Sequence, residues 1–330
     1  MKAMILAVSL SFLFSFYDVA LAQLTKVTVG YSGIGASHFP AWVAKESGIF
    51  RTNGLDVQLV YFTGGTTAVM ALLSRDAPIM QMAGPAIVSA GLRGSDTVMI
   101  AGGFVTADQW LMSRPEIKTA VQLKGGSVAI ARFGGLADSM ARIALQKLGL
   151  TPIKDVAIVQ IGGVPERLSA LEKGKVQATL LGITETLMAQ KKGFYTLVNV
   201  SLPYQSVGVA TTRRFIRESP EIVKRYVRSQ IEAIHCIKTD RETGRRVLVK
   251  YLALQDREIL EKTYDDISAD DKLPPKQYPT LEGLKNILEP LAETDPKAKT
   301  AKAEDFVDMR FIKELDDSGF IDELYKTGKR

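Results

Sequence analysis

Short β-rich apolar runs alternate with helical segments from Lys26 to about Asn199. Runs of this length and composition predict strands. In the first half of the region, strands are expected at residues 27–31, 55–61, 79–82 and 98–102. Helical segments follow the first three of these strands, and this alternation favours a parallel sheet covered by helices on both faces.

The same alternation resumes after a crossing segment at residues 109–125. New strands are expected at residues 128–131, 156–161 and 176–181, and a helical segment follows each of them. Residues 207–211 predict a return strand, and the chain beyond them is mostly helical. The sequence therefore predicts a second α/β unit of the same style, followed by a helical tail.

The first residues have a hydrophobic pattern of their own. Lys2 precedes an apolar run over residues 3–17, and residues 20–22, Ala-Leu-Ala, have the small-x-small pattern of a cleavage site. Together these features predict a secretory signal peptide over residues 1–22, cleaved after Ala22. A membrane anchor is the alternative, but the apolar run is shorter than the ~20 residues that span a bilayer.

Length and charge narrow the choice of function. The 330 residues suit two domains, since single cores rarely grow past ~250–300 residues. The net charge is +6, yet basic side chains are scattered apart from a modest cluster at Lys297, Lys299 and Lys302. Nucleic-acid binding needs a contiguous basic patch with interleaved aromatic residues, so we expect no nucleic-acid partner. A mild positive field can instead attract anionic solutes.

The single cysteine, Cys236, excludes an intramolecular disulfide. It lies in a helical apolar pattern, which favours packing over reactivity. No cysteine stands at the expected cleavage site, so no lipid can be attached there. Together with the signal peptide, these observations predict a soluble periplasmic protein.

Glycines recur where predicted strands pass into helices. These junctions are Gly64-Gly65, Gly84, Gly134-Gly135 and Gly162-Gly163. A helix start has unpaired amides and partial positive charge, and glycine lets a ligand approach the backbone closely. In open α/β sheets, ligands bind beyond the carboxyl ends of the strands, where these junctions fall. Tight turns also need glycine, but four junctions in two units favour a shared cleft that suits a carboxylate, sulfonate or phosphate.

Known catalytic and metal-binding motifs are missing from the sequence. The only histidines, His38 and His235, are far apart, and no Cys/His cluster exists. Ser32 lies in a sequence that breaks the esterase pattern at its last position, and residues 33–35 do not extend to a dinucleotide fingerprint. We therefore expect neither an enzyme nor a cofactor or metal. His38 opens a helix and is either an exposed helix-start residue or a donor in a pocket wall.

Four sequence blocks stand out: PAWVAKESGIF at residues 40–50, NGLDV at 53–57, LKGGSVA at 123–129 and ALEKGKVQA at 170–178. These blocks resemble the aliphatic sulfonate, taurine and nitrate binding proteins of ABC importers, a group related to thiamine-pyrimidine synthesis proteins. The resemblance covers roughly residues 27–212. It implies a type II periplasmic binding protein fold, in which each of two lobes is a mostly parallel sheet flanked by helices.

The resemblance also implies a domain division and a site. Lobe I is expected to hold residues 23–110 and 207–330, with the helical tail packed on it, and lobe II residues 111–206. Carried onto this sequence, the family's ligand contacts are Ser32, Gly33, His38, Gly64, Gly65, Thr66 and Gly84 in lobe I, and Phe133, Gly134, Gly135, Val164, Pro165 and Thr184 in lobe II. Arg132 and Arg167 lie near the right junctions to clamp an anion, although either side chain can also point to solvent.

The implied function is that of a monomeric solute-binding protein. It would capture a small anionic or aromatic solute by hinge closure and present it to a membrane permease. Sulfonates, carboxylates, nitrate and pyrimidines all remain open as ligands. The alternatives are an enzyme on the same fold, such as a thiamine-pyrimidine synthase, and a sensory ligand-binding module. The enzymes carry a cysteine-rich signature, and a sensor needs a membrane span or a signalling domain.

Overall fold

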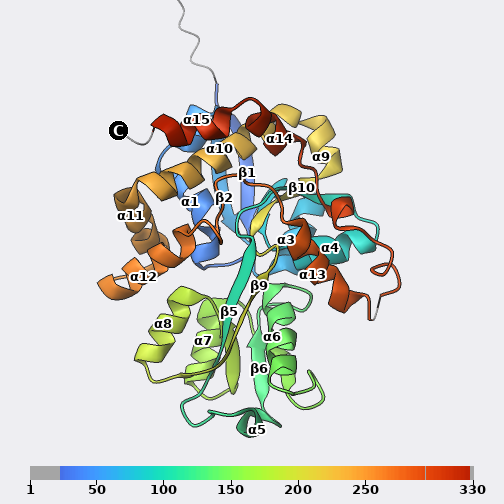
Figure 1. The fold of residues 1–330 in the computed structure, drawn as a ribbon, viewed down its shortest axis with the longest axis vertical. Coiled ribbons are helices and arrows are strands. Elements are labelled where there is room, and N and C mark those ends of the chain that lie inside the picture. Colours follow the sequence, from blue (N-terminus) through green and yellow to red (C-terminus); the bar gives the residue numbers. More distant parts are fainter. Residues whose placement is uncertain (1–22, 294, 328–330) are drawn as a thin grey trace, which may run out of the picture.

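The chain forms two lobes, each built on its own five-stranded sheet (Figure 1). The computed structural model describes residues 23–293 and 295–327, so the predicted signal peptide lies outside the described residues. Within the described part, no helix is long and apolar enough to cross a membrane.

The sheet of lobe I has the strand order β2-β1-β3-β10-β4. Its strands are β1 (Thr25–Tyr31), β2 (Leu55–Tyr61), β3 (Ile79–Met82), β4 (Thr97–Ala101) and β10 (Gly208–Thr212). Strand β1 pairs in parallel with β2 and β3, whereas β10 runs antiparallel between β3 and β4. All five positions of β10 are buried, as expected of an interior strand.

The sheet of lobe II has the order β7-β6-β8-β5-β9. Its strands are β5 (Thr106–Ser113), β6 (Ser127–Ile130), β7 (Ala157–Gln160), β8 (Ala178–Leu181) and β9 (Tyr195–Pro203). Strand β6 pairs in parallel with β7 and β8, whereas β5 runs antiparallel between β8 and β9. The boundary expected between residues 110 and 111 falls inside β5, and the one expected between 206 and 207 falls between β9 and β10.

Each sheet is mostly parallel, as expected: four strands run in one direction and a single strand, β10 in lobe I or β5 in lobe II, runs against them. These two antiparallel strands are the ones that adjoin the crossing segments. After β4 the chain enters lobe II as β5, and after β9 it returns to lobe I as β10; each incoming strand runs against its neighbours. Strand β9, which sequence reasoning did not assign, completes the second sheet by pairing along the whole length of β5.

Helices cover both sheets, and most start directly after a strand. In lobe I they are α1 (Phe39–Glu46), α2 (Ile49–Thr52), α3 (Gly65–Ser74), α4 (Gly84–Leu92) and α9 (Arg213–Glu218), with a short 3-10 helix η1 (Ala36–His38) before α1. In lobe II they are α5 (Ala120–Leu123), α6 (Leu136–Lys147), α7 (Val164–Glu172) and α8 (Ile183–Lys191). Pro40 and Pro165 stand in the first turns of α1 and α7, where proline loses no helical hydrogen bond.

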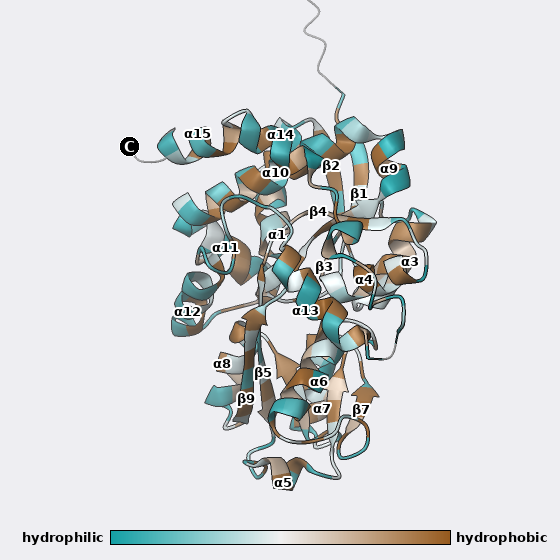
Figure 2. Cartoon of the chain, turned by 45° about the vertical axis from the view of Figure 1, so that its right-hand side comes forward, coloured by the Kyte–Doolittle hydropathy of each residue, from teal (hydrophilic) through white to brown (hydrophobic). Residues whose placement is uncertain are grey.

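The C-terminal segments pack mainly on lobe I. They comprise α10 (Pro220–Thr239), α11 (Arg241–Leu252), α12 (Arg257–Ser268), α13 (Leu281–Leu291), η2 (Ala303–Phe306), α14 (Arg310–Asp317) and α15 (Phe320–Thr327). Helix α10 lays a row of buried residues, including Val223, Val227 and Ile234, against the lobe I core. Apolar residues accordingly concentrate on the strands and the inward helix faces (Figure 2).

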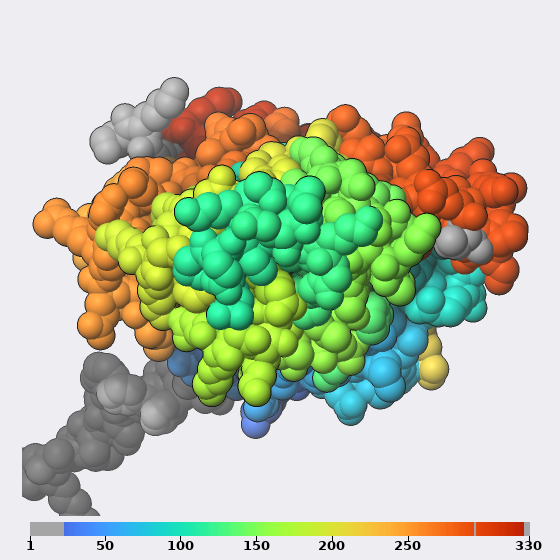
Figure 3. Space-filling view, turned by 90° about the horizontal axis from the view of Figure 1, so that it is seen from below, coloured from blue at the N-terminus to red at the C-terminus, as the bar shows by residue number. Residues whose placement is uncertain are grey.

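Two C-terminal helices also contact lobe II. Helix α12 packs against α8, and α13 packs against β9 as well as α4. Viewed from below, lobe II stands in front, with orange C-terminal segments to its left, above it and to its right, and the blue N-terminal part along its lower edge (Figure 3). The tail therefore bridges the lobes as well as covering lobe I.

Candidate functional site

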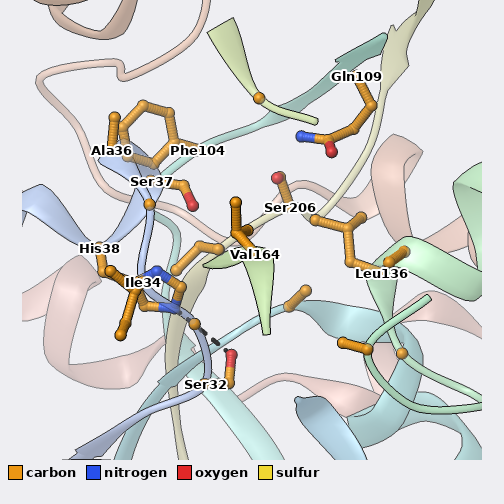
Figure 4. A pocket seen from close by; sticks show the side chains of 18 of the residues that line it. Ser32, Ile34, Ala36, Ser37, His38, Phe104, Gln109, Leu136, Val164 and Ser206 are labelled. Carbon is orange, nitrogen blue, oxygen red and sulfur yellow. Dashed lines mark hydrogen bonds between the residues drawn. The ribbon is translucent and has the colours of Figure 1, made fainter. Parts of the chain in front are cut away.

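A cavity of about 170 Å³ lies between the two lobes. Segments that follow β1, β2 and β3 line it from lobe I, and segments that follow β6, β7 and β8 line it from lobe II. Parallel strands place their carboxyl ends at one edge of a sheet, which is where open α/β proteins bind ligands. In the close-up, labelled side chains from both lobes surround one hollow, with His38 and Ser32 on one side and Leu136 on another (Figure 4).

Nine of the predicted site residues line this cavity. They are Ser32, Gly33, His38, Gly64, Gly65, Arg132, Gly135, Val164 and Thr184. The structure thus brings together residues from four separate strand-to-helix junctions and from the loop after the first strand. This placement agrees with the geometry that the glycine junctions predicted.

Five predicted residues lie outside the lining: Thr66, Gly84, Phe133, Gly134 and Pro165. Thr66 Oγ1 donates to the Phe133 carbonyl at 2.8 Å, so this pair joins the lobes at the rim of the cleft. The Gly84 amide donates to the Gln205 carbonyl at 2.9 Å, and Gly134 donates to Asp138 Oδ2 at 2.9 Å. These two amides already have protein partners, and Pro165 is exposed on α7.

Six helices begin at the cavity without a side-chain cap among the described residues. Their N-cap residues, all of which line the cavity, are His38, Gly64, Ala83, Gly135, Gly163 and Gly182. Helices that start elsewhere often do have such a cap: Thr119, Thr212, Asp240, Asp256 and Thr280 each accept a hydrogen bond from their own helix. The cavity is therefore surrounded by helix starts whose amides suit a ligand acceptor.

The two lobes differ in the charge of these helix starts. The first turns of α6, α7 and α8 in lobe II carry Asp138, Glu166 and Glu185, whereas the first turns of α1, α3 and α4 in lobe I carry no acidic residue. A carboxylate near a helix N-terminus already interacts with the partial positive charge of that terminus. A ligand anion is therefore better accommodated on the lobe I side.

His38 is buried in the lobe I wall, with 4% of its surface exposed. Its Nε2 lies 3.4 Å from Ser32 Oγ (Figure 4), and its Nδ1 has no hydrogen-bond partner in the described part of the chain. Burial lowers the pKa of His38 from 6.5 to about 4. The ring is therefore neutral near pH 7, and it combines one N–H donor with one acceptor nitrogen.

Two arginines reach the cavity, which answers a question that the sequence left open. Arg167 is buried, and Arg132 passes Gly64 so closely that a β-carbon on Gly64 would lie 2.7 Å from Arg132 Cγ. Glu185 also lines the cavity and is buried. Desolvation raises the pKa of its carboxyl group, and the Arg167 charge opposes that shift.

Sequence reasoning missed a charged cluster and several polar residues of the lining. Lys272 Nζ donates to Asp108 Oδ2 at 2.7 Å and also pairs with Asp266. Asp108 lies on β5, whereas Asp266 and Lys272 come from the C-terminal segment. Ser37, Gln109 and Ser206 also line the cavity. None of these residues belongs to a strand–glycine–helix unit, so the pattern used for prediction carried no signal for them.

Replacing Lys272 with methionine should destabilise the protein by about 1 kcal/mol at pH 7. The change leaves Asp108 and Asp266 side by side and partly buried without their cation. The expected loss of stability therefore lies between the losses typical of exposed and of buried ion pairs. The deficit should shrink as the pH falls, because protonation of Asp266 removes one charge and burial already raises its pKa. Urea unfolding at two pH values measures both effects.

The matched control is Lys262→Met, which removes a lysine from an exposed pair with Glu258 on the same part of the chain. This variant should unfold within about 0.5 kcal/mol of the original protein. Equal stabilities for the Lys272 and Lys262 variants would show that the cluster at the cavity contributes no more than a surface pair.

Solved structures share this two-lobed arrangement. The alkanesulfonate-binding protein SsuA from Xanthomonas axonopodis pv. citri, bound to MOPS, matches with a TM-score of 0.68 and 15% identity, over 85% of this chain and 96% of that one. The periplasmic nitrate-binding protein NrtA from Synechocystis PCC 6803 matches with a TM-score of 0.67 and 15% identity, over 90% and 89%. The architecture is therefore the periplasmic binding protein fold.

The family is shown by the sequence itself. Residues 21–253 match the model of the NMT1-like family, and the chain belongs to that family. YtlA of Bacillus subtilis (strain 168), whose name classes it as a binding protein, is 25% identical over 179 residues, which are 53% of this chain and 54% of YtlA. The match thus spans about half the length of this curated relative.

Proposed function

We propose that this chain is the solute-binding component of an ABC importer and binds a small anionic or aromatic organic solute in the cavity between its lobes. One observation carries the proposal: six helix starts without side-chain caps converge on that cavity from both lobes. Preorganised backbone amides of this kind suit a carboxylate or sulfonate group. YtlA, SsuA and NrtA, each of which is named as a binding protein, support the same class of function.

In this proposal, the anionic group lies against lobe I and the body of the solute against apolar side chains. The lobe I contacts are His38, Ser32 and the backbone amide of Gly65; the Gly64 amide already donates to the Ser32 carbonyl at 3.0 Å. Phe104, Leu136 and Val164 supply the apolar walls (Figure 4). A solute with one charged end and a compact apolar or aromatic body satisfies both kinds of surface.

Hinge closure between the two lobes is the proposed motion. The division expected from the sequence, 23–110 and 207–330 against 111–206, is kept except that all of β5 (Thr106–Ser113) moves with lobe II, because it belongs to the lobe II sheet. Two segments connect the lobes side by side: Phe104 N–H donates to the Val207 carbonyl at 2.7 Å, and Ser206 N–H donates to the Phe104 carbonyl at 3.0 Å. Contacts at the cleft edge then stabilise the closed form, including Lys191 with Asp256 at 2.7 Å. A permease would distinguish the closed form from the open one.

The same proposal includes export after cleavage behind Ala22 and a monomeric state. Fractionation of the natural host and light scattering of the purified protein test these two points. A cytoplasmic location would contradict the first, and a stable oligomer the second.

Thermal unfolding with a panel of organic anions tests the central claim, using the chain from residue 23 onward. A solute present at a hundred times its dissociation constant should stabilise the protein by ~2.7 kcal/mol. Small-angle X-ray scattering with that solute should show compaction. A panel of carboxylates and sulfonates that leaves the unfolding temperature unchanged would contradict the proposal.

A further inference from the structure

The lobe II side of the cavity carries two buried ionisable side chains on successive helices. Arg167 on α7 is 5% exposed and Glu185 on α8 is 8% exposed, and both line the cavity. Burial of a charge is unfavourable unless hydrogen bonds or an opposite charge compensate it. The contacts of each group therefore indicate what a bound solute has to supply.

Arg167 is held in place by lobe II but is incompletely hydrogen-bonded. Its Nη1 donates to Thr179 Oγ1 at 2.9 Å and to the Leu180 carbonyl, both on β8. Its Nε has no hydrogen-bond partner among the described residues. A buried donor without an acceptor is rare in folded proteins and destabilises them. The guanidinium group is thus held through Nη1, and its buried Nε is a donor without a protein acceptor among the described residues.

Glu185 supplies the complementary acceptor. It stands in the first turn of α8, where its carboxyl group accepts a hydrogen bond from its own backbone amide. The Glu185 and Arg167 charges interact, yet no ion pair joins the two side chains within the part of the chain that the structure describes. A donor and an acceptor therefore flank the lobe II side of the cavity without satisfying each other.

We infer that Arg167 and Glu185 bind a neutral group that both accepts and donates hydrogen bonds, such as a carboxamide or ureido group. Its carbonyl oxygen accepts from Arg167 Nε, and its N–H donates to a Glu185 carboxyl oxygen. The inference rests on the proposed function, because it assigns the anionic end of the same solute to lobe I. The cavity then selects a mono-anion with an amide-type group at its far end.

Charged groups fit this side of the cavity less well. A second carboxylate would satisfy Arg167 but would meet the Glu185 carboxylate, and like charges at close range are unfavourable. An ammonium group would suit Glu185 but leave Arg167 Nε without an acceptor. Only a group that both accepts and donates hydrogen bonds satisfies Arg167 and Glu185 together.

Calorimetry with matched probes tests this selectivity on the chain from residue 23 onward. The probes are succinamate against succinate and phthalamate against phthalate, at a pH where both dicarboxylates are dianions. The half-amide should bind at least tenfold more tightly than the dicarboxylate in at least one pair. Glu185→Gln should reduce that ratio to below about threefold, because it removes the charge that repels the second carboxylate while keeping the shape of the side chain.

Two further variants separate this role from a structural one. Glu166→Gln removes an exposed first-turn carboxylate that does not line the cavity, and it should leave the ratio unchanged. Arg167→Lys keeps the positive charge but loses Nε. It should weaken the half-amide at least tenfold, and by a larger factor than it weakens benzoate, which has no amide. Circular dichroism confirms that each variant is folded.

Each outcome bears on the inference. Half-amides that bind no better than dicarboxylates, or a ratio that Glu185→Gln leaves intact, would overturn it while the proposed function stands. The same holds if other organic anions stabilise the protein and neither half-amide binds. If no organic anion binds at all, the proposed function fails and the inference fails with it.

Discussion

Acidification from pH 7 to pH 5 should lower the free energy of unfolding by about 2 kcal/mol through His38 alone, and by about 3 kcal/mol at pH 4. Burial lowers the pKa of this imidazole to about 4 in the folded protein, against 6.5 in the unfolded chain. Between these values the unfolded state binds a proton that the folded state does not bind. Stability therefore decreases as the pH falls through this window and is restored above about pH 7.

Urea unfolding of the original protein and of His38→Gln at several pH values measures this contribution. Glutamine does not titrate, so the variant should lose at least 1 kcal/mol less than the original protein between pH 7 and pH 5. His235→Gln is the matched control, since His235 is the other histidine and is only partly buried; it should preserve most of the dependence. Parallel pH profiles for the original protein and His38→Gln would contradict the prediction. They would mean that His38 takes up its proton in the folded state as readily as in the unfolded state.

Replacement of Gly64 by alanine should weaken solute binding at least tenfold, or ~1.4 kcal/mol. Gly64 has φ +80° and ψ 162°, a conformation that is essentially restricted to glycine. The new β-carbon would also lie 2.7 Å from Arg132 Cγ, across the gap between the lobes. Separation of the lobes relieves this overlap, so the substitution should oppose the closed form in particular. Calorimetry with a solute found by the thermal screen measures the change in affinity.

Gly94→Ala is the matched control for backbone strain. Gly94 also has a positive φ, +92°, but a β-carbon there would meet no atom within 4 Å. Both substitutions should lower the unfolding temperature, and only Gly64→Ala should reduce affinity. Equal losses of affinity in the two variants would point to general destabilisation rather than to a contact between the lobes.

Local sequence determined most of the elements that build the cavity. Strands β2 and β3 have the bounds that the hydrophobic pattern predicted, because these segments combine a clear pattern with clear stop signals. The glycines at 64–65, 134–135 and 162–163 marked helix starts for the same local reason. Since parallel strands align their carboxyl ends, the pattern also indicated that these starts face a common cavity.

Only the tertiary structure decided which side chains complete the site. The sequence placed Arg132 and Arg167 near the right junctions, but their direction depends on packing: Arg167 turns inward because Thr179 and Leu180 of β8 hold it. Lys272 and Asp266 reach the cavity because α12 packs against α8 of the other lobe. That contact joins segments some seventy residues apart, and no local pattern encodes it.

The sequence by itself therefore determined the two α/β units, their helix starts and the edge at which those starts gather. The direction of β5 and β10, the bridging position of the C-terminal helices and the charge balance of the cavity were decided by the tertiary structure. The physical reason is the distance along the chain over which each kind of interaction acts. Periodicity and turn chemistry act over a few neighbouring residues, whereas burial and pairing of charges depend on contacts that exist only after the chain has crossed twice between the lobes.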